Sequence, residues 1–268
     1  MLRIRQEKSF KFGYTPITTE DEAEDNTLMD FGSLRLAQGQ VERLLEKKKE
    51  IAILLVQGEV TLRWNGQNKT IKRLSCFVEN PWVLHVPSNV AVEVIGVSED
   101  SELSITKTTQ TGTFEAKLYY PEECRAEERG KGTLKEASTR IVRTVFEYSN
   151  APYSNLVVGE VINFPGKWSS YPPHHHPQPE IYFYKFYPET GYGFAELGED
   201  VVKVRHNDTV KILNDATHPQ ATAPGYAMYY IWVIRHLEGN PYKSPEYPVF
   251  NTEHLWVTEK NVKIWPDK

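Results

Sequence analysis

The sequence is poor in cysteine, with only Cys76 and Cys124 among its 268 residues. Their spacing matches no zinc-binding or thiol–disulfide exchange motif, so a cysteine-based metal site or redox centre is not expected. Two free thiols in a reducing compartment is the simplest interpretation. A chain of this length can bury a sufficient hydrophobic core without disulfide bonds.

Long apolar runs are missing as well. No segment approaches the ~18 apolar residues that a membrane-spanning helix needs. The first residues, MLRIRQEKSFKFGY, contain no apolar stretch like that of a secretory signal. An excess of basic charge is also absent, since the formal net charge is -5 and the isoelectric point is about 6.0. This balance favours neither nucleic acid nor a membrane surface as a partner, and the protein is predicted to be cytoplasmic.

Aromatic and β-branched residues, in contrast, are plentiful, and many alternate with polar ones. This period of two is typical of β-strands. Asn65-Gly66 predicts a two-residue hairpin turn. The one tempting helix is 40–50, whose charged second half fits a solvated loop equally well. The pattern as a whole predicts an all-β sandwich or barrel. Its predicted strands are 51–64, 90–97, 140–147, 155–162, 180–187 and 226–235.

A polar, glycine-containing segment divides the chain. Residues 126–138 are predicted to be a linker or long loop between an N-terminal half at 1–125 and a C-terminal half at 139–268. The halves share one short match, because EIAILL at 50–55 resembles EIYFYK at 180–185. We interpret the match as a sign of a duplicated β-barrel.

The segment from His174 to Glu180, HHHPQPE, is the most informative stretch for function. In an extended strand alternate side chains share one side, so His174 and His176 point together while His175 points away. A turn through the prolines would return Glu180 to the same side. Two imidazoles and a carboxylate suit Zn, Mn, Fe, Co or Ni, and His218 is the best candidate for a fourth ligand. A surface histidine tract is the alternative.

The same alternation selects candidate substrate contacts. With Glu180 facing inward, Tyr182 and Tyr184 share its face, where they are candidate catalytic residues that offer hydroxyl groups to a polyhydroxylated ligand, or simply fill the barrel. Tyr229 and Trp232 lie on a second aromatic strand, and we select both as candidate substrate contacts although the sequence does not fix which way that strand faces.

Two arginines precede the strands of this site. Arg140 and Arg143 are candidate clamps for an acid substrate, because a guanidinium group pairs with a carboxylate through two hydrogen bonds. Arginines exposed on the surface of a strand are the alternative interpretation.

These motifs resemble a known family. The order His-x-His-xxx-Glu with a later His is similar to cupin metal motifs. The blocks WSSYPPHHH at 168–176 and HPQATAPGYAMYY at 218–230 look like those of 5-deoxy-glucuronate isomerases of myo-inositol catabolism. They are also similar to 4-deoxy-5-keto-uronate isomerases of pectin breakdown. The resemblance implies a bicupin, with two tandem double-stranded β-helix (jelly-roll) barrels of which the N-terminal one is degenerate.

The resemblance also implies an activity, the isomerisation of 5-deoxy-D-glucuronate to 2-deoxy-5-keto-D-gluconate with one divalent metal. Zn or Mn is favoured over Fe, Co and Ni. His174, His176, Glu180 and His218 match the family's metal positions. An aldose–ketose isomerisation moves a proton between adjacent carbons and therefore needs a base. Glu180 is one candidate, a tyrosinate or a metal-bound hydroxide is another, and a hydride shift is the alternative route.

Other function classes fit the same residues. Two histidines and a carboxylate also suit an Fe(II) cupin dioxygenase, and vestigial histidines would fit a non-catalytic bicupin that binds sugar acids. Leu44, Glu46 and Glu50 stand in the first half where the histidines and the glutamate would fall, so no metal triad is expected there. A sugar acid is the expected partner, and a homo-oligomer is compatible with the sequence.

Overall fold

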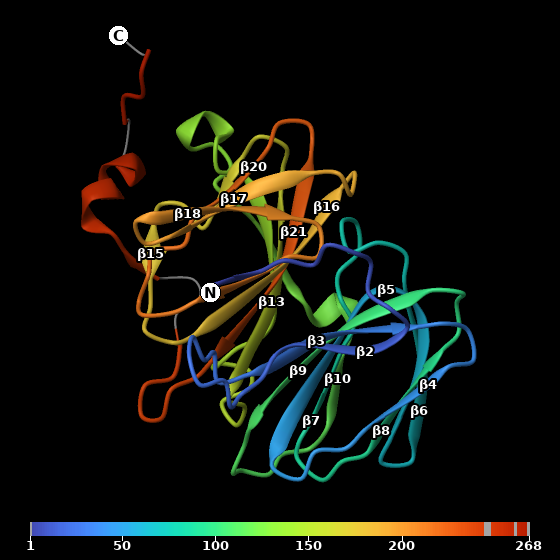
Figure 1. The fold of residues 1–268 in the computed structure, drawn as a ribbon. Coiled ribbons are helices and arrows are strands. Elements are labelled where there is room, and N and C mark those ends of the chain that lie inside the picture. Colours follow the sequence, from blue (N-terminus) through green and yellow to red (C-terminus); the bar gives the residue numbers. More distant parts are fainter. Residues whose placement is uncertain (1, 244–247, 260–261, 267–268) are drawn as a thin grey trace.

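Strands dominate the fold of this protein. The structure is a computed structural model that describes residues 2–243, 248–259 and 262–266. Helical turns in these ranges are the short 3-10 segments η1 (Pro121–Glu123), η2 (Leu134–Glu136) and η3 (Thr252–Thr258). Nowhere in the described ranges is a helix long and apolar enough to cross a membrane. Figure 1 shows the N-terminal half, blue to green, packed against the C-terminal half, yellow to red. The all-β prediction is confirmed.

The N-terminal half forms a nine-stranded sheet with the main order β10-β7-β5-β9-β3-β2, to which β4, β6 and β8 are joined. The first part of β5 pairs with β7 and β9, and its last part pairs with β6 and β8. Between these parts lies Gly58, where φ is +101° and Ser101 approaches so closely that a Cβ atom would clash. The strands are β2 (Gly13–Thr18), β3 (Asp30–Leu36), β4 (Val41–Leu44), β5 (Lys49–Trp64), β6 (Gln67–Arg73), β7 (Val83–Val86), β8 (Val92–Gly96), β9 (Ser101–Thr109) and β10 (Lys117–Tyr119).

Two local predictions in this half have opposite outcomes. The hairpin at Asn65-Gly66 is confirmed, because both residues have the positive φ angles, 45° and 74°, of a type I′ turn. The helix at 40–50 is wrong, since this segment forms β4 and the start of β5. Pairing of β4 with β8 buries Leu44, and this tertiary contact outweighs the local helix propensity.

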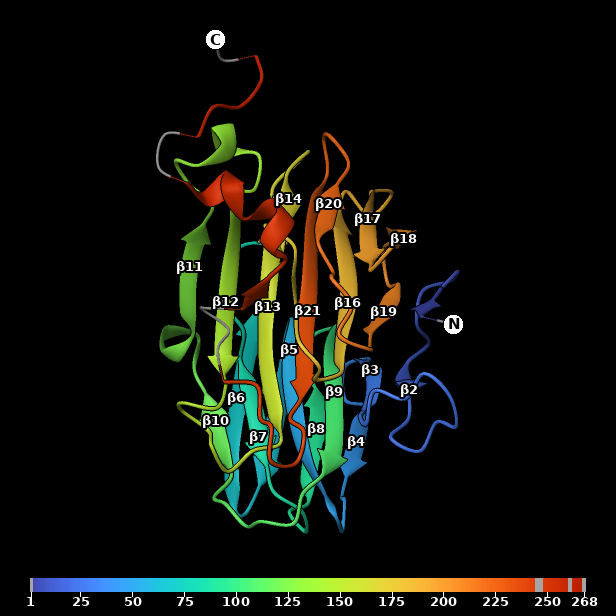
Figure 2. The same cartoon turned by 90° about the vertical axis from the view of Figure 1, so that its left-hand side faces the viewer.

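The C-terminal half contains a seven-stranded sheet in the order β1-β19-β16-β21-β13-β12-β11. Figure 2 shows its strands side by side, from β11 at one edge to β19, the neighbour of the other edge strand, β1. A four-stranded sheet, β14-β20-β17-β18, and the pair β15–β22 complete the half. The strands are β1 (Arg3–Ile4), β11 (Arg125–Arg129), β12 (Arg140–Phe146), β13 (Leu156–Asn163), β14 (Trp168–Ser169), β15 (His174–His175), β16 (Glu180–Tyr187), β17 (Tyr192–Leu197), β18 (Asp200–Arg205), β19 (Thr209–Ile212), β20 (Gln220–Thr222), β21 (Ala227–Arg235) and β22 (Val249–Phe250).

The segment between the halves differs from the predicted loop. Residues 126–129 belong to β11, which pairs antiparallel with β12 over its whole length, and η2 follows within the same segment. The N-terminal strand β1 also joins the C-terminal sheet, where it pairs with β19. The division into domains at 1–125 and 139–268, with 126–138 as linker, stays a prediction.

Among the described residues, three apolar clusters form the core. One fills the N-terminal half and one the C-terminal half, while the third lies between them and draws residues from both. Alternation along β5 explains the arrangement, since Ile51 and Ile53 face the N-terminal core while Ala52 and Leu54 face the cluster between the halves. Both cysteines are buried free thiols, and burial raises the pKa of Cys76 to about 12, which disfavours the reactive thiolate.

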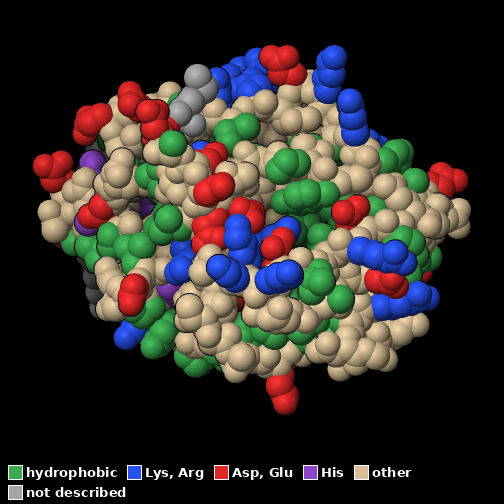
Figure 3. All heavy atoms as spheres, turned by 60° about the horizontal axis from the view of Figure 1, so that its bottom comes forward, with side chains coloured by type: hydrophobic (Ala, Val, Ile, Leu, Met, Phe, Trp, Pro, Cys, Tyr) green, Lys and Arg blue, Asp and Glu red, His purple; other side chains and the backbone are tan. Residues whose placement is uncertain are grey.

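A buried ion pair also joins the halves. The guanidinium group of Arg73, on β6, binds both carboxylate oxygens of Glu160, on β13, at 2.7 and 2.8 Å. Both side chains are fully buried. Lys185 and Glu102 form a second buried contact at 2.6 Å across the same boundary. On the face shown in Figure 3, by contrast, acidic and basic side chains lie interspersed at the surface.

Candidate metal centre

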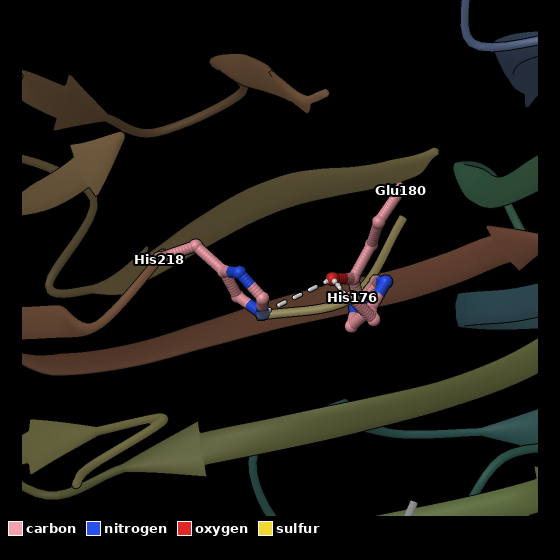
Figure 4. A group of neighbouring side chains, drawn as sticks. All are labelled: His176, Glu180 and His218. Atoms are coloured by element: carbon pink, nitrogen blue, oxygen red, sulfur yellow. Dashed lines mark ion pairs between the residues drawn. The ribbon is translucent and has the colours of Figure 1, made fainter. Parts of the chain in front are cut away.

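Three side chains from the C-terminal half converge inside its barrel. The Oε2 atom of Glu180, at the start of β16, lies 3.3 Å from Nε2 of His176 and 3.4 Å from Nε2 of His218. Figure 4 shows both imidazoles directed at this carboxylate oxygen. The three ligand atoms lie within 4.8 Å of one another, and all three residues are buried. The alternation along the histidine run and the proline turn therefore bring together residues that the sequence selected.

Hydrogen bonds fix which nitrogen of each imidazole faces the carboxylate. Nδ1 of His176 lies 2.9 Å from the carbonyl oxygen of Gln178, and Nδ1 of His218 lies 2.9 Å from that of Ala216. A carbonyl oxygen only accepts, so Nδ1 of each ring carries a proton, and Nε2 is the nitrogen that faces the carboxylate. Burial lowers the pKa of His218, which favours the neutral imidazole that binds metals.

The donor atoms of this group fit a divalent cation. Oε2 of Glu180 and Nε2 of His218 are buried and have no hydrogen-bond partner among the described residues. Unsatisfied buried polar atoms are costly, and here a buried carboxylate oxygen faces the Nε2 atoms of two imidazoles. A divalent ion bound by these atoms would satisfy all of them, and two imidazoles with a carboxylate are a donor set that such ions prefer.

His174 and His175 behave differently. The ring of His174 lies 4.6 Å, centroid to centroid, from that of His218, and His174 lines the same cavity. It is not part of the group whose donor atoms lie within 4.8 Å, so its role as a ligand stays a prediction. His175 is absent from the lining and pairs with Asp215 at 2.7 Å, as strand alternation predicts.

A cavity of about 180 Å³ opens beside these residues. Hydroxyl groups line one part of it, contributed by Ser169, Ser170, Tyr182 and Tyr230. Apolar or largely apolar side chains line another part, contributed by Val142, Val161, Trp232 and Ile234. Glu180 is the one carboxylate among the described lining residues. A small polyhydroxylated molecule matches a cavity with this mixture of surfaces.

The two tyrosines of β16 occupy different depths. Tyr182 lines the cavity, with its hydroxyl 3.3 Å from Oγ of Ser170. Tyr184 lies outside the lining and donates a hydrogen bond of 2.7 Å to Gln220. Burial raises the pKa of both phenols, so each stays protonated and a tyrosinate base is disfavoured. Tyr182 is therefore suited to donate a hydrogen bond, and Tyr184 does not reach the cavity.

The second aromatic strand, β21, presents alternate residues to the cavity. Tyr230 and Trp232 line it, and the Nε1 atom of Trp232 is buried without a partner. Tyr229 faces the boundary between the halves, where its hydroxyl donates to Glu160. Tyr229 is thus not part of the candidate site, whereas Tyr230, which the sequence-based selection omitted, belongs to it. Because side chains alternate along a strand and Tyr229 and Trp232 are three residues apart, the two could not share a face.

The two predicted arginine clamps also separate by face. Arg140 lines the cavity, and its buried Nε atom has no partner. Its guanidinium donates to the carbonyl oxygen of Ser138 at 2.9 Å, and no acidic partner lies within 4.0 Å in the described ranges. Arg143 points the other way, where it lies 3.3 Å from Glu160 and donates to the carbonyl oxygen of Cys76. Arg143 therefore does not belong to the candidate site.

Several lining residues were missed from sequence. Arg129 pairs in register with Arg140 across β11 and β12, but it lies within the predicted linker at 126–138, where no strand was expected. Phe250 reaches the cavity because β22 pairs with β15, and its segment carried no strand signal. Tyr171 and Tyr242 also line the cavity from loops.

The N-terminal half has no equivalent group in the described ranges, where His176, Glu180 and His218 are the one cluster at ligand spacing. Glu50, aligned by sequence with Glu180, faces the boundary between the halves instead of the barrel interior. There it lies 2.6 Å from Nε2 of His85.

Comparison with known families agrees with the site. The model of the KduI/IolB family matches residues 4–257, nearly the whole chain. The chain belongs to this family. A 5-deoxy-glucuronate isomerase of Geobacillus kaustophilus is 29% identical over 249 residues, which cover 85% of this chain and 84% of that protein.

Solved structures show the same fold. An IolB-like protein from Salmonella typhimurium aligns with a TM-score of 0.84 at 22% identity, covering 97% of this chain and 100% of that one. Oxalate decarboxylase of Lactobacillus farciminis, solved as a formate complex, aligns with a TM-score of 0.66 at 10% identity over 97% and 91% of the two chains. The likeness to this bicupin supports the bicupin fold expected from the sequence.

Proposed function

We propose that this protein is a metal-dependent aldose–ketose isomerase that converts 5-deoxy-D-glucuronate to 2-deoxy-5-keto-D-gluconate. The observation that carries the proposal is one cavity that combines a buried His/Glu cluster with the half-buried Arg140, which has no acidic partner among the described residues. A metal ion held by the cluster would bind the oxygens of an aldehyde and its neighbouring hydroxyl, and Arg140 would bind a carboxylate. Family relatives named 5-deoxy-glucuronate isomerase, such as that of Geobacillus kaustophilus, support this choice of substrate.

In this proposal His176, Glu180 and His218 hold the ion, with His174 as fourth ligand, and Zn or Mn is the favoured metal. When bound, a divalent ion supplies Lewis-acid polarisation of the substrate carbonyl. The neutral hydroxyl of Tyr182 donates a hydrogen bond to a substrate oxygen, because burial keeps it protonated.

Proton transfer between the two carbons falls to Glu180. It is the one carboxylate among the described residues of the lining, and burial disfavours the tyrosinate alternative. The proton leaves C2 of the aldose and returns to C1, while the hydroxyl proton on O2 passes to O1, so the net reaction is balanced. A positioned base of this kind typically contributes about 10²–10⁴-fold to the rate.

Product formation tests the proposal directly. Protein loaded with Zn or Mn should convert 5-deoxy-D-glucuronate to the 2-ketose, followed by loss of the aldehyde signals in ¹H NMR. The 4-deoxy-5-keto-uronate of pectin breakdown serves as the competing substrate, and faster turnover of it would reassign the substrate. Turnover that requires Fe(II) and stops under argon would contradict isomerisation and favour the dioxygenase.

Replacing Arg140 with methionine should impair recognition of the substrate carboxylate. Charged hydrogen bonds contribute about 1.5–3 kcal/mol, so kcat/KM should fall by about 10–150-fold, mainly through KM. 5-Deoxy-D-glucose, which carries a hydroxymethyl group in place of the carboxylate, supplies the control. Wild type and Arg140→Met should turn it over at similar kcat/KM values, and an equal loss on both substrates would show that Arg140 is not the carboxylate clamp.

A further inference from the structure

The register of the C-terminal sheet orders the lining residues in rows across the barrel. Val142 of β12 pairs with Val161 of β13, and Val161 pairs with Tyr230 of β21. Arg140 is the next residue on the same face of β12. Glu180 lies in a different row, since it pairs with Ile234 at the other end of β21. The valine row therefore lies next to Arg140, between it and the row of Glu180.

The two valines form a continuous apolar surface. Directly paired residues on one face of an antiparallel sheet have their Cβ atoms about 4.5–5.5 Å apart. Val142 is 7% and Val161 5% exposed, and both line the cavity. Neither side chain can accept or donate a hydrogen bond, so a hydroxyl group held against this pair would lose its water without replacement.

The proposed substrate has a matching order of groups. Its carboxylate is C6, its methylene is C5, hydroxyls follow on C4, C3 and C2, and the aldehyde is C1. With the carboxylate at Arg140 and C1–C2 at the His/Glu cluster, C5 lies beside the carboxylate. From this order we infer that the Val142–Val161 pair receives the C5 methylene and selects 5-deoxy acids against hexuronates with a 5-hydroxyl. The inference rests on the proposed function and adds the residues that distinguish a C5 methylene from a C5 carbon bearing a hydroxyl.

Val161→Thr tests the selection, because threonine keeps the shape of valine and has a hydroxyl in place of one methyl group. D-Glucuronate, which differs from the substrate by the 5-hydroxyl, is the probe, and its KI is measured against turnover of 5-deoxy-D-glucuronate. An apolar site rejects an added hydroxyl by up to about 100-fold, so the ratio of KI to KM should fall about 10-fold in the variant. The 5-hydroxyl also lets glucuronate close a six-membered ring, but this affects every variant equally and leaves the change in ratio intact.

A matched control is available on the same strand. Val157 faces the same core on β13 but does not line the cavity, so Val157→Thr should leave the ratio unchanged. Val142→Thr repeats the test from β12 if Val161→Thr does not fold. An unchanged ratio in the folded lining variant, or an equal change in Val157→Thr, would overturn the inference. Absence of turnover of 5-deoxy-D-glucuronate by wild type would instead overturn the proposed function.

Discussion

Replacing His176 with alanine should remove bound metal and activity together. Nε2 of His176 faces the carboxylate of Glu180 at 3.3 Å, with its lone pair directed at the proposed ion. Residues that only orient ligands change metal affinity by about 10–100-fold, so loss of a ligand should exceed that range. Lewis-acid polarisation contributes several kcal/mol, and kcat/KM should fall by about 10³-fold or more. Metal content by mass spectrometry and NMR turnover measure both effects on one preparation.

His175 supplies the matched control within the same histidine run. It lies one residue from His176, but it points away from the cavity and pairs with Asp215. His175→Ala should keep its metal and stay within about threefold of wild-type activity, as surface substitutions usually do. Retention of metal and activity in His176→Ala would remove the metal-site assignment. Equal losses in both variants would show that the histidine run acts as an unspecific tract.

Alternation singled out His176 against His175, and a turn through the prolines was enough to return Glu180 to the same side, whereas His218 was selected apart from both arguments. Alternation was not enough for the arginines. Arg140 and Arg143 are three residues apart and therefore face opposite sides of β12, but the pattern does not say which of the two faces the barrel interior. Only the neighbouring sheet decides which side is the barrel. The N-terminal half occupies the side of Arg143, and no local pattern encodes that contact.

The same limit explains the errors in the fold. The segment 40–50 contains charged residues spaced as on a helix face, yet β4 forms because β8 offers a partner about fifty residues away. Residues 126–129 are polar enough for a loop, but they pair with the edge of the C-terminal sheet, where polar side chains can face water. The match of 50–55 with 180–185 fell on strands that pair on both sides, but Glu50 contacts His85 and Ser154 at the boundary between the halves, unlike Glu180.

Replacing Arg73 with methionine should destabilise the protein by about 3 kcal/mol, because a buried charge that loses its partner costs about 3–5 kcal/mol. The lower value is expected, since Arg143 at 3.3 Å still faces Glu160. Urea unfolding measures the change. The exposed pair of Arg43 and Glu93 offers the comparison, and Arg43→Met should leave the unfolding midpoint unchanged.

A double-mutant cycle then separates the ion pair from the packing around it. Glu160→Gln alone leaves the Arg73 guanidinium buried without its carboxylate, so it too should be destabilising. The double variant, with Arg73→Met and Glu160→Gln, buries no unpaired charge from this pair and should lose less than the sum of the single variants, by about 2 kcal/mol. If the losses in free energy of unfolding are additive, the two side chains stabilise the protein only through packing and not through their ionic interaction. Because Glu160 also accepts from Tyr229, on the strand that carries Tyr230 and Trp232, turnover by each folded variant shows how far the boundary between the halves supports the cavity.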